Sequence, residues 1–410
     1  MGIDLTVVPL ARVREAVASL LLYRSLWSTD LGHRWVRLVQ CEDPAQLPSL
    51  YGEWFANLAE VGCSWSDWLW ATVALHDNPF SRVVSAGIPL TQVPTPLREA
   101  AAHDLTQLHI CVAAMPLLHQ MWRDHGILVL WPEPPGIPDW AESVETLANH
   151  YRQHGVGFWG QYRAARWRQG QWQGIAHPDD TTLDDLYGWE RQKAALCRNT
   201  EALLAGSRAL HVLLYGARGT GKSSLVKAIL NRYGSQGLRL VEITREDVLA
   251  LPTLLDSLRS QPHKFVVFID DLSFEADETL FKPLKVMLEG DMAGLPAHVC
   301  LYATSNRRHL IREYFSDRPN PANTEVHAGD TVQEKLSLAD RFGLTLTFSP
   351  MTQADYFATV IHLAHRHGLT RDPEWLRQQA LIWAQQQNGF SGRTARQLIT
   401  ALQAGLIISG

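Results

Sequence analysis

In the second half of the chain, short apolar runs alternate with stretches of helical spacing. The runs are five to seven residues long and rich in Val, Leu and Ile, at 211–216, 238–244, 264–270, 298–304 and 344–348. Such runs are typical of strands buried on both faces. Helical spacing separates them at 222–232, 246–260, 276–289 and 306–314. Strands alternating with helices predict an α/β domain over 183–350, with a five-stranded parallel sheet.

Beyond residue 350 the strand-type runs stop. Apolar positions recur at helical spacing in 352–367, 373–387 and 391–406, which predicts a small α-helical lid over 351–410. Residues 316–331 are polar and rich in turn formers, so we expect a mobile insertion there.

The first 180 residues show helical spacing without strand alternation. The pattern predicts helices at 9–27, 48–61, 64–76, 95–114 and 138–153. Residues 162–176 look less helical and fit a short hairpin. The polar stretch 177–182 is typical of a linker. We therefore predict a mostly α-helical N-terminal domain over 1–180.

Composition narrows the class of protein. Of 410 residues, 46% are hydrophobic and 19% are charged, as in ordinary globular proteins. This excludes a largely disordered or fibrous chain, and no apolar run has the length of a membrane helix. The five cysteines are dispersed and form no CxxC pair. Such usage is typical of a reducing compartment, so we expect a cytoplasmic protein without a membrane partner.

Charge does not favour nucleic acid as a partner. Residues 1–180 carry twelve arginines, no lysine and 18 acidic residues, and the remainder is nearly neutral. A general nucleic-acid binder needs a basic excess. The cluster of Arg163, Arg166, Trp167 and Arg168 has the residue types that bind single strands, but it lies in the acidic half.

Tryptophan is concentrated in the N-terminal half, where 12 of the 15 occur. The rings either fill the core of a helical domain or form a face that binds a partner. We favour the core.

The first candidate site is a phosphate-binding loop. Residues 216–223 fit the pattern GxxxxGK[ST] between a predicted strand and a predicted helix. Glycines let successive backbone N–H groups turn toward an anion at the positive end of the helix. Lys222 is expected to reach the β- and γ-phosphates, and Ser223 to ligate Mg²⁺. The predicted nucleotide-binding residues here are Gly216, Ala217, Arg218, Gly219, Thr220, Gly221, Lys222, Ser223 and Ser224.

Two acidic residues end the strand predicted at 264–270. Asp270 stands where a carboxylate can hold the magnesium ion, and Asp271 is a candidate base for the attacking water. Glu275 is a second candidate base, less well placed.

The order of these motifs resembles that of the AAA+ ATPases. After the phosphate loop and the acidic strand end come YATSN at 302–306, LADRFG at 338–343 and SGR at 391–393. The blocks DDLSFE, YATSNRRHLI and EKLSLADRFGL most closely resemble an uncharacterised prokaryotic AAA+ group. This group is a domain of unknown function whose members are described only as predicted ATPases. The resemblance spans about 183–406. It implies a P-loop NTPase αβα sandwich that binds and hydrolyses ATP with Mg²⁺, and in which Asp271 replaces the commoner Glu.

The resemblance also implies roles for single residues. Asn306 matches the sensor-1 residue that contacts the attacking water or γ-phosphate, although it could simply cap the following helix. Arg341 matches the arginine finger that reaches a neighbouring subunit. Arg393 matches the sensor-2 arginine of the lid. Tyr187 and Gly188 match the segment whose backbone contacts adenine.

Alternatives remain for the arginines. Arg341 could form a surface ion pair, and Arg307 and Arg308 compete with it for the role in a neighbouring site. Arg396 lies one turn beyond Arg393 and competes for the sensor-2 role.

Three functions fit these residues. The first is an oligomeric ATPase that remodels or loads a macromolecular partner bound through its N-terminal domain. The second is a switch that binds ATP or ADP with little hydrolysis. The third, a small-molecule kinase, is disfavoured because it needs neither sensor residues nor an arginine acting in a neighbouring site. We also expect Lys222→Ala to abolish ATP binding with little loss of fold, on the premise that this lysine faces solvent.

Overall fold

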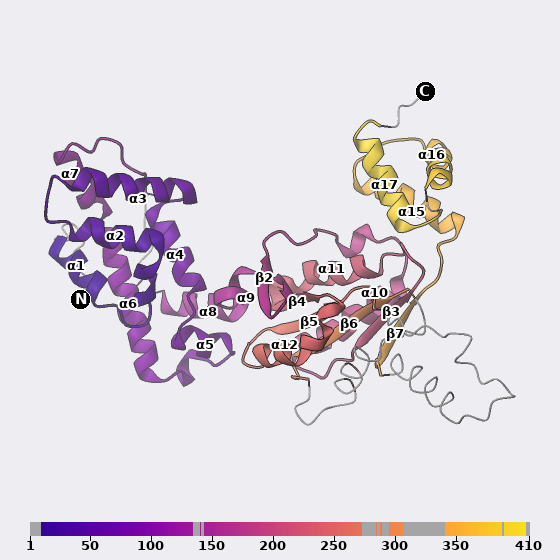
Figure 1. The fold of residues 1–410 in the computed structure, drawn as a ribbon, viewed down its shortest axis with the longest axis horizontal. Helices are drawn as coiled ribbons and strands as arrows, with labels where there is room; N and C mark the ends of the chain where they lie inside the picture. Colours follow the sequence, from indigo (N-terminus) through magenta and orange to yellow (C-terminus); the bar gives the residue numbers. More distant parts are fainter. Residues whose placement is uncertain are drawn as a thin grey trace. The chain divides into compact units, whose positions relative to one another are not determined.

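The computed structural model describes residues 10–133, 140, 143–272, 284, 288, 295–306, 341–387 and 389–406. The chain divides into two compact units, Met1–Gln161 and Tyr162–Gly410, shown in Figure 1. The predicted helices at 276–289 and 306–314 fall almost entirely outside the described residues. The predicted insertion at 316–331 lies outside them completely. No helix within the described ranges is long and apolar enough to span a membrane.

Helices are the regular secondary structure of the first unit within its described residues. Its elements are α1 Leu10–Ala18, η1 Arg24–Ser28, α2 Asp30–Gln40, α3 Leu47–Val61, α4 Trp65–Leu75, α5 Pro79–Ser85, η2 Leu90–Gln92, α6 Thr95–Ala113, α7 Met115–Asp124, α8 Val144–His154 and α9 Gly157–Gln161. The pattern of the sequence missed α2, α5, α7 and α9.

Tryptophan rings form the centre of this unit. Trp35, Trp54, Trp65 and Trp122 are fully buried. Ring centroids lie 4.3 Å apart for Trp35 and Trp65 and 5.7 Å apart for Trp54 and Trp122. All fifteen tryptophans lie within the described residues, and none is exposed. The prediction that the rings fill a core is therefore confirmed for these four, since a fully buried ring cannot form a binding face.

The second unit is built on a seven-stranded sheet in the order β2-β1-β4-β5-β6-β3-β7. Its strands are β1 Ala164–Arg168, β2 Gln171–Ile175, β3 Val212–Gly216, β4 Leu238–Ile243, β5 Lys264–Ile269, β6 Val299–Ser305 and β7 Leu344–Phe348. The β1–β2 pair is antiparallel and all other pairs are parallel. The five predicted strands are confirmed. The predicted size of the sheet is wrong, because the hairpin of β1 and β2 adds two strands to the five.

The hairpin moves the start of this unit toward the N-terminus. Ala164 of β1 pairs with Leu240 of β4, so the hairpin continues the parallel sheet. Trp167 is buried, which removes it as a stacking platform for nucleic acid. The polar stretch at 177–182, which we expected to be a linker, is bound to α11 (Lys222–Tyr233) by the Asn231 amide, which donates to the carbonyls of Asp179 and Thr181. The compact unit thus begins at Tyr162 rather than near residue 180.

Helices cover the sheet. The remaining elements of the α/β part are η3 Leu183–Asp185, α10 Glu190–Leu204, η4 Gly234–Gln236, η5 Glu246–Ala250 and α12 Leu251–Leu258. Apolar residues of α10 and α11 pack with one face of the sheet in a single core. Figure 1 shows α12 on the other side. The α10 helix was not predicted, because it is polar and buries only Leu196, Thr200 and Leu203.

Three helices form the lid, as predicted. They are α15 Gln353–Arg366, α16 Pro373–Gln386 and α17 Gly392–Gln403. Each begins at a residue whose side chain accepts a hydrogen bond from a first-turn N–H group: Thr352, Asp372 and Ser391. Tyr356, Leu376 and Leu398 lie in their shared core.

A truncation tests the position of the boundary. We expect a fragment starting at residue 162 to unfold at higher urea concentration than one starting at 183, because the shorter fragment exposes the edge of β4. Loss of Trp167 burial alone is expected to cost about 2 kcal/mol. Circular dichroism of both fragments in urea measures the difference. Equal midpoints would show that the hairpin does not belong to this unit.

Candidate functional site

The phosphate loop is shaped by glycines that no other residue can replace without strain. Gly216, Gly219 and Gly221 have φ values of 144°, 75° and 92°. A Cβ atom on Gly216 would lie 1.9 Å from the carbonyl oxygen of Phe348. One on Gly219 would lie 2.8 Å from the Cβ of Ser391, at the start of lid helix α17. The glycines therefore provide both the turn and the close approach of β7 and the lid.

Lys222 is enclosed by its own loop. Its Nζ donates to the carbonyls of Gly216 at 2.9 Å and Ala217 at 2.7 Å, and to Asn306 Oδ1 at 3.1 Å. The residue is only 6% exposed. Burial lowers the pKa of this ammonium, while the nearby Asp271 and Asp270 carboxylates oppose the shift. The premise that Lys222 faces solvent is therefore wrong.

The two residues predicted to hold magnesium lie side by side. Ser223 Oγ donates to Asp270 Oδ1 at 2.6 Å. Thr304 Oγ1 donates to the same oxygen at 2.6 Å. Sequence reasoning missed Thr304, although it lies only two residues before Asn306 at the end of β6.

Asp271 and Asn306 also meet. Asn306 Nδ2 donates to Asp271 Oδ1 at 2.6 Å, and the Asp271 N–H donates to Thr304 Oγ1 at 2.8 Å. Asp271 has a φ of 52°, in the left-handed region. Asp tolerates this conformation better than longer side chains do, which gives a physical reason for Asp at this position. Glu275, the second candidate base, lies outside the described residues.

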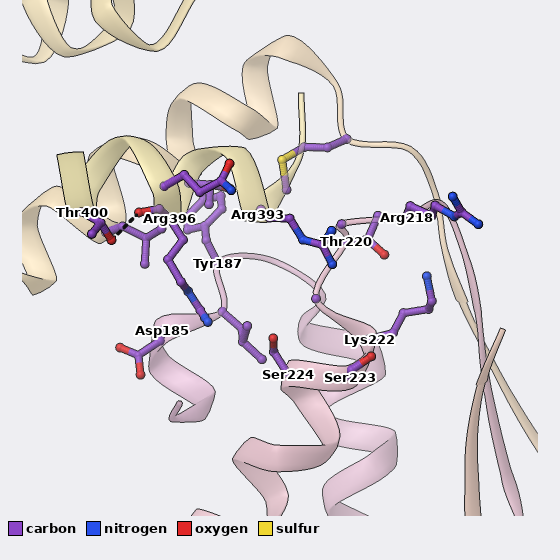
Figure 2. A pocket seen from close by; sticks show the side chains of 18 of the residues that line it. Asp185, Tyr187, Arg218, Thr220, Lys222, Ser223, Ser224, Arg393, Arg396 and Thr400 are labelled. Carbon is purple, nitrogen blue, oxygen red and sulfur yellow. Dashed lines mark hydrogen bonds between the residues drawn. The ribbon is translucent and has the colours of Figure 1, made fainter. Parts of the chain in front are cut away.

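These side chains line a cavity of about 930 Å³ between the phosphate loop and the lid. Arg393 and Arg396 extend into it from α17, as Figure 2 shows. Apolar side chains also line the cavity, from Leu186, Met351, Leu363, Trp383, Ala401, Ala404 and Leu406, together with the polar residues Asp185, Thr359, Gln397 and Thr400. The phosphate loop thus suits phosphates, and the apolar lining residues with polar neighbours suit a flat group such as a nucleobase.

The segment predicted to contact adenine borders this cavity. Tyr187 lines it, and the Tyr187 ring lies 5.5 Å from that of His362 in the lid. Gly188 and Trp189 both have left-handed backbones, with φ values of 75° and 62°. Two such residues in succession turn the chain sharply into α10. The Trp189 ring then packs 5.0 Å from Phe348.

The lid is joined to the rest of the unit by polar contacts. The Gly392 N–H donates to the Gly219 carbonyl at 2.9 Å. Arg366 Nη2 donates to Asp185 Oδ1 at 2.9 Å. Burial alone would raise the pKa of Asp185, but hydrogen bonds from Thr182 and the Arg366 guanidinium bring it below its ordinary value. The lid therefore contacts both the phosphate loop and the segment that leads to Tyr187.

Arg341 does not share this cavity. It is exposed and is absent from the described lining residues. Its rivals Arg307 and Arg308 lie outside the described residues. The structure brings Arg393 and Arg396 to the cavity together, so both candidates for the sensor-2 role remain.

Comparison with known proteins identifies a family and a set of structural likenesses. Residues 160–406 match the family described as Protein of unknown function (DUF815). No curated protein matches the chain. Similar solved structures include the RuvB Holliday junction branch migration motor of Thermotoga maritima, at 19% identity and a TM-score of 0.37, covering 55% of this chain and 65% of that one. The Aeropyrum pernix ORC2 protein in its ADPNP-ADP complexes is 18% identical, with a TM-score of 0.36, covering 53% and 62%. Each likeness thus covers less than two thirds of the other protein.

The buried position of Lys222 changes the expected effect of its removal. Lys222→Ala leaves two carbonyls and the Asn306 amide without their donor, so we expect the free energy of unfolding to fall by about 1–3 kcal/mol. Lys227→Ala, on the same helix, removes a partly exposed pair with Asp179 and is expected to cost less than about 1 kcal/mol. Urea unfolding of both variants compares them. Equal stability would contradict an enclosed Lys222.

Proposed function

We propose that this chain, which belongs to the family described as Protein of unknown function (DUF815), binds ATP with Mg²⁺ and hydrolyses it, as the resemblance of its motifs to those of AAA+ ATPases implies. We propose further that it acts as a homo-oligomer on a macromolecular partner held by the N-terminal unit. All five cysteines are free thiols, which supports the cytoplasm as its location.

One observation carries the proposal. A single hydrogen-bonded network joins the phosphate loop to both acids: Lys222 bonds to Asn306, Asn306 to Asp271, and Ser223 to Asp270. A glycine-rich turn that occurred by chance would not be hydrogen-bonded to the two carboxylates that follow β5. The network lies in a cavity that apolar residues such as Leu186, Met351 and Trp383 also line.

The residues present fit a magnesium ion. The Ser223 hydroxyl and the Asp270 carboxylate line the same cavity, and Mg²⁺ prefers such oxygen ligands, with phosphate oxygens and water completing its shell. When bound, the ion would neutralise charge on the β- and γ-phosphates.

The remaining residues would act on the phosphates and the water. Lys222 would bind the β- and γ-phosphates, and the loop N–H groups would cradle them. Asp271 would accept the proton of the attacking water, and Asn306 would orient that water. From the lid, Arg393 and Arg396 would offset negative charge at the phosphates.

A second function has an observation in its favour. The Asp271 carboxylate is held by the Asn306 amide at 2.6 Å, and its side chain is one methylene shorter than that of Glu. A short base that is already hydrogen-bonded is less able to deprotonate water. This favours a switch that binds nucleotide and hydrolyses it slowly.

Replacing Asp271 separates the two functions. For an ATPase we expect Asp271→Asn to bind ATP like the wild type and to hydrolyse it at least about 100-fold more slowly, because the base is lost. Asn also tolerates a positive φ, so the backbone should keep its shape. Calorimetry measures binding, and phosphate release measures turnover. Unchanged slow turnover in Asp271→Asn would favour the switch and remove Asp271 as the base.

Replacing Arg341 tests whether the protein acts as an oligomer. If it completes a neighbouring subunit's site, Arg341→Ala should bind ATP normally and lose about 10³-fold in turnover. Wild-type turnover per subunit should then rise with protein concentration. The matched control is Arg377→Ala in the lid, where the side chain forms an exposed pair with Glu374. An Arg341→Ala protein with wild-type turnover would exclude the role in a neighbouring site.

A further inference from the structure

Thr304 occupies a central position among the acids, although within the motif at 302–306 the sequence assigned a role only to Asn306. It lies near the carboxyl end of β6 and is 2% exposed. Its hydroxyl makes two hydrogen bonds, one to the Asp270 carboxylate and one from the Asp271 N–H. Its carbonyl accepts a third, from the Leu272 N–H at 2.7 Å. One buried residue thus fixes three consecutive residues after β5.

The directions of these hydrogen bonds are determined by chemistry. A backbone N–H can only donate, so Thr304 Oγ1 accepts from Asp271. An ionised carboxylate can only accept, so the Thr304 hydroxyl proton must go to Asp270. The branched side chain restricts rotation about χ1. The hydroxyl is therefore a fixed bridge between the two acids.

The bridge selects one oxygen of Asp270. Ser223 and Thr304 both donate to Oδ1, at 2.6 Å each. Among the described residues, no hydrogen bond ends on Oδ2. Two donors on the same oxygen fix the plane of the carboxylate, so Oδ2 remains for a metal ion or its water.

We propose that Thr304 is a positioning residue for the magnesium site: it orients Asp270 toward the ion and holds the backbone of Asp271 in its left-handed conformation. This role rests on the proposed function, because it requires a metal and a nucleotide in the cavity. Residues that orient metal ligands typically contribute ten- to 100-fold to metal affinity.

A purely structural role makes a different prediction. A buried hydroxyl that only satisfied a backbone N–H would affect stability when removed, with no selective effect on metal binding. The distinction therefore requires metal affinity and nucleotide affinity to be measured separately.

The experiment compares Thr304→Val, which keeps the shape and removes the hydroxyl, with Thr304→Ser, which keeps the hydroxyl. Thr200→Val is the control, because Thr200 is also fully buried and its hydroxyl bonds to Leu196 and Tyr302, with no contact to either acid. ATP affinity is measured by calorimetry in EDTA. Mn²⁺ affinity in the presence of ATP is measured from the free-ion signal in electron paramagnetic resonance.

We expect Thr304→Val to raise the half-saturating Mn²⁺ concentration about tenfold or more. Its ATP affinity in EDTA should stay within about threefold of wild type. Thr304→Ser and Thr200→Val should stay within about threefold for both ligands. If Thr304→Val does not fold, Thr304→Cys replaces it, because a thiol is a weaker donor, and it should weaken Mn²⁺ binding at least about threefold.

Wild-type Mn²⁺ affinity in the variant without the hydroxyl would overturn the role of Thr304. So would an equal loss of ATP affinity in EDTA. A wild-type protein that binds no ATP even in the calorimeter would instead refute the proposed function, and the role of Thr304 would fail with it.

Discussion

The site depends on the parallel pairing of β5, β6 and β3, which places their carboxyl ends at one edge of the sheet. In the observed register Ile269 pairs with Ala303, and Tyr215 pairs with Ser305. One residue further along each pair, Asp270 lies opposite Thr304, and Gly216 lies opposite Asn306. A shift of any strand by one residue would turn these side chains to the opposite face. The polar network therefore exists because the apolar strands pair in this register.

The same strands explain why much of the fold could be predicted. A strand covered on both faces must be apolar at almost every position, so its run stands out in the sequence. The hairpin at 164–175 lacks this signal, because β2 is an edge strand with largely exposed side chains. The sequence did predict a short hairpin at 162–176, and the structure confirms it, but nothing in the pattern placed it in the sheet. The boundary of the unit was misplaced for the same reason.

In the site, too, some features could be predicted from the sequence and others could not. Glycines that need a positive φ, and the Lys-Ser pair that follows them, leave a local pattern that can be recognised without a structure. The enclosure of Lys222 and the bridge through Thr304 leave none, because both depend on which strands are neighbours. A threonine within a buried strand is indistinguishable in sequence from one that fills space.

The proposed function requires a nucleoside triphosphate with magnesium to bind in the cavity between the phosphate loop and the lid. Calorimetric titration of the purified wild-type chain with ATP, with and without Mg²⁺, tests it most directly. We expect one saturable site per chain and tighter binding when Mg²⁺ is present. An absence of binding under both conditions would contradict it.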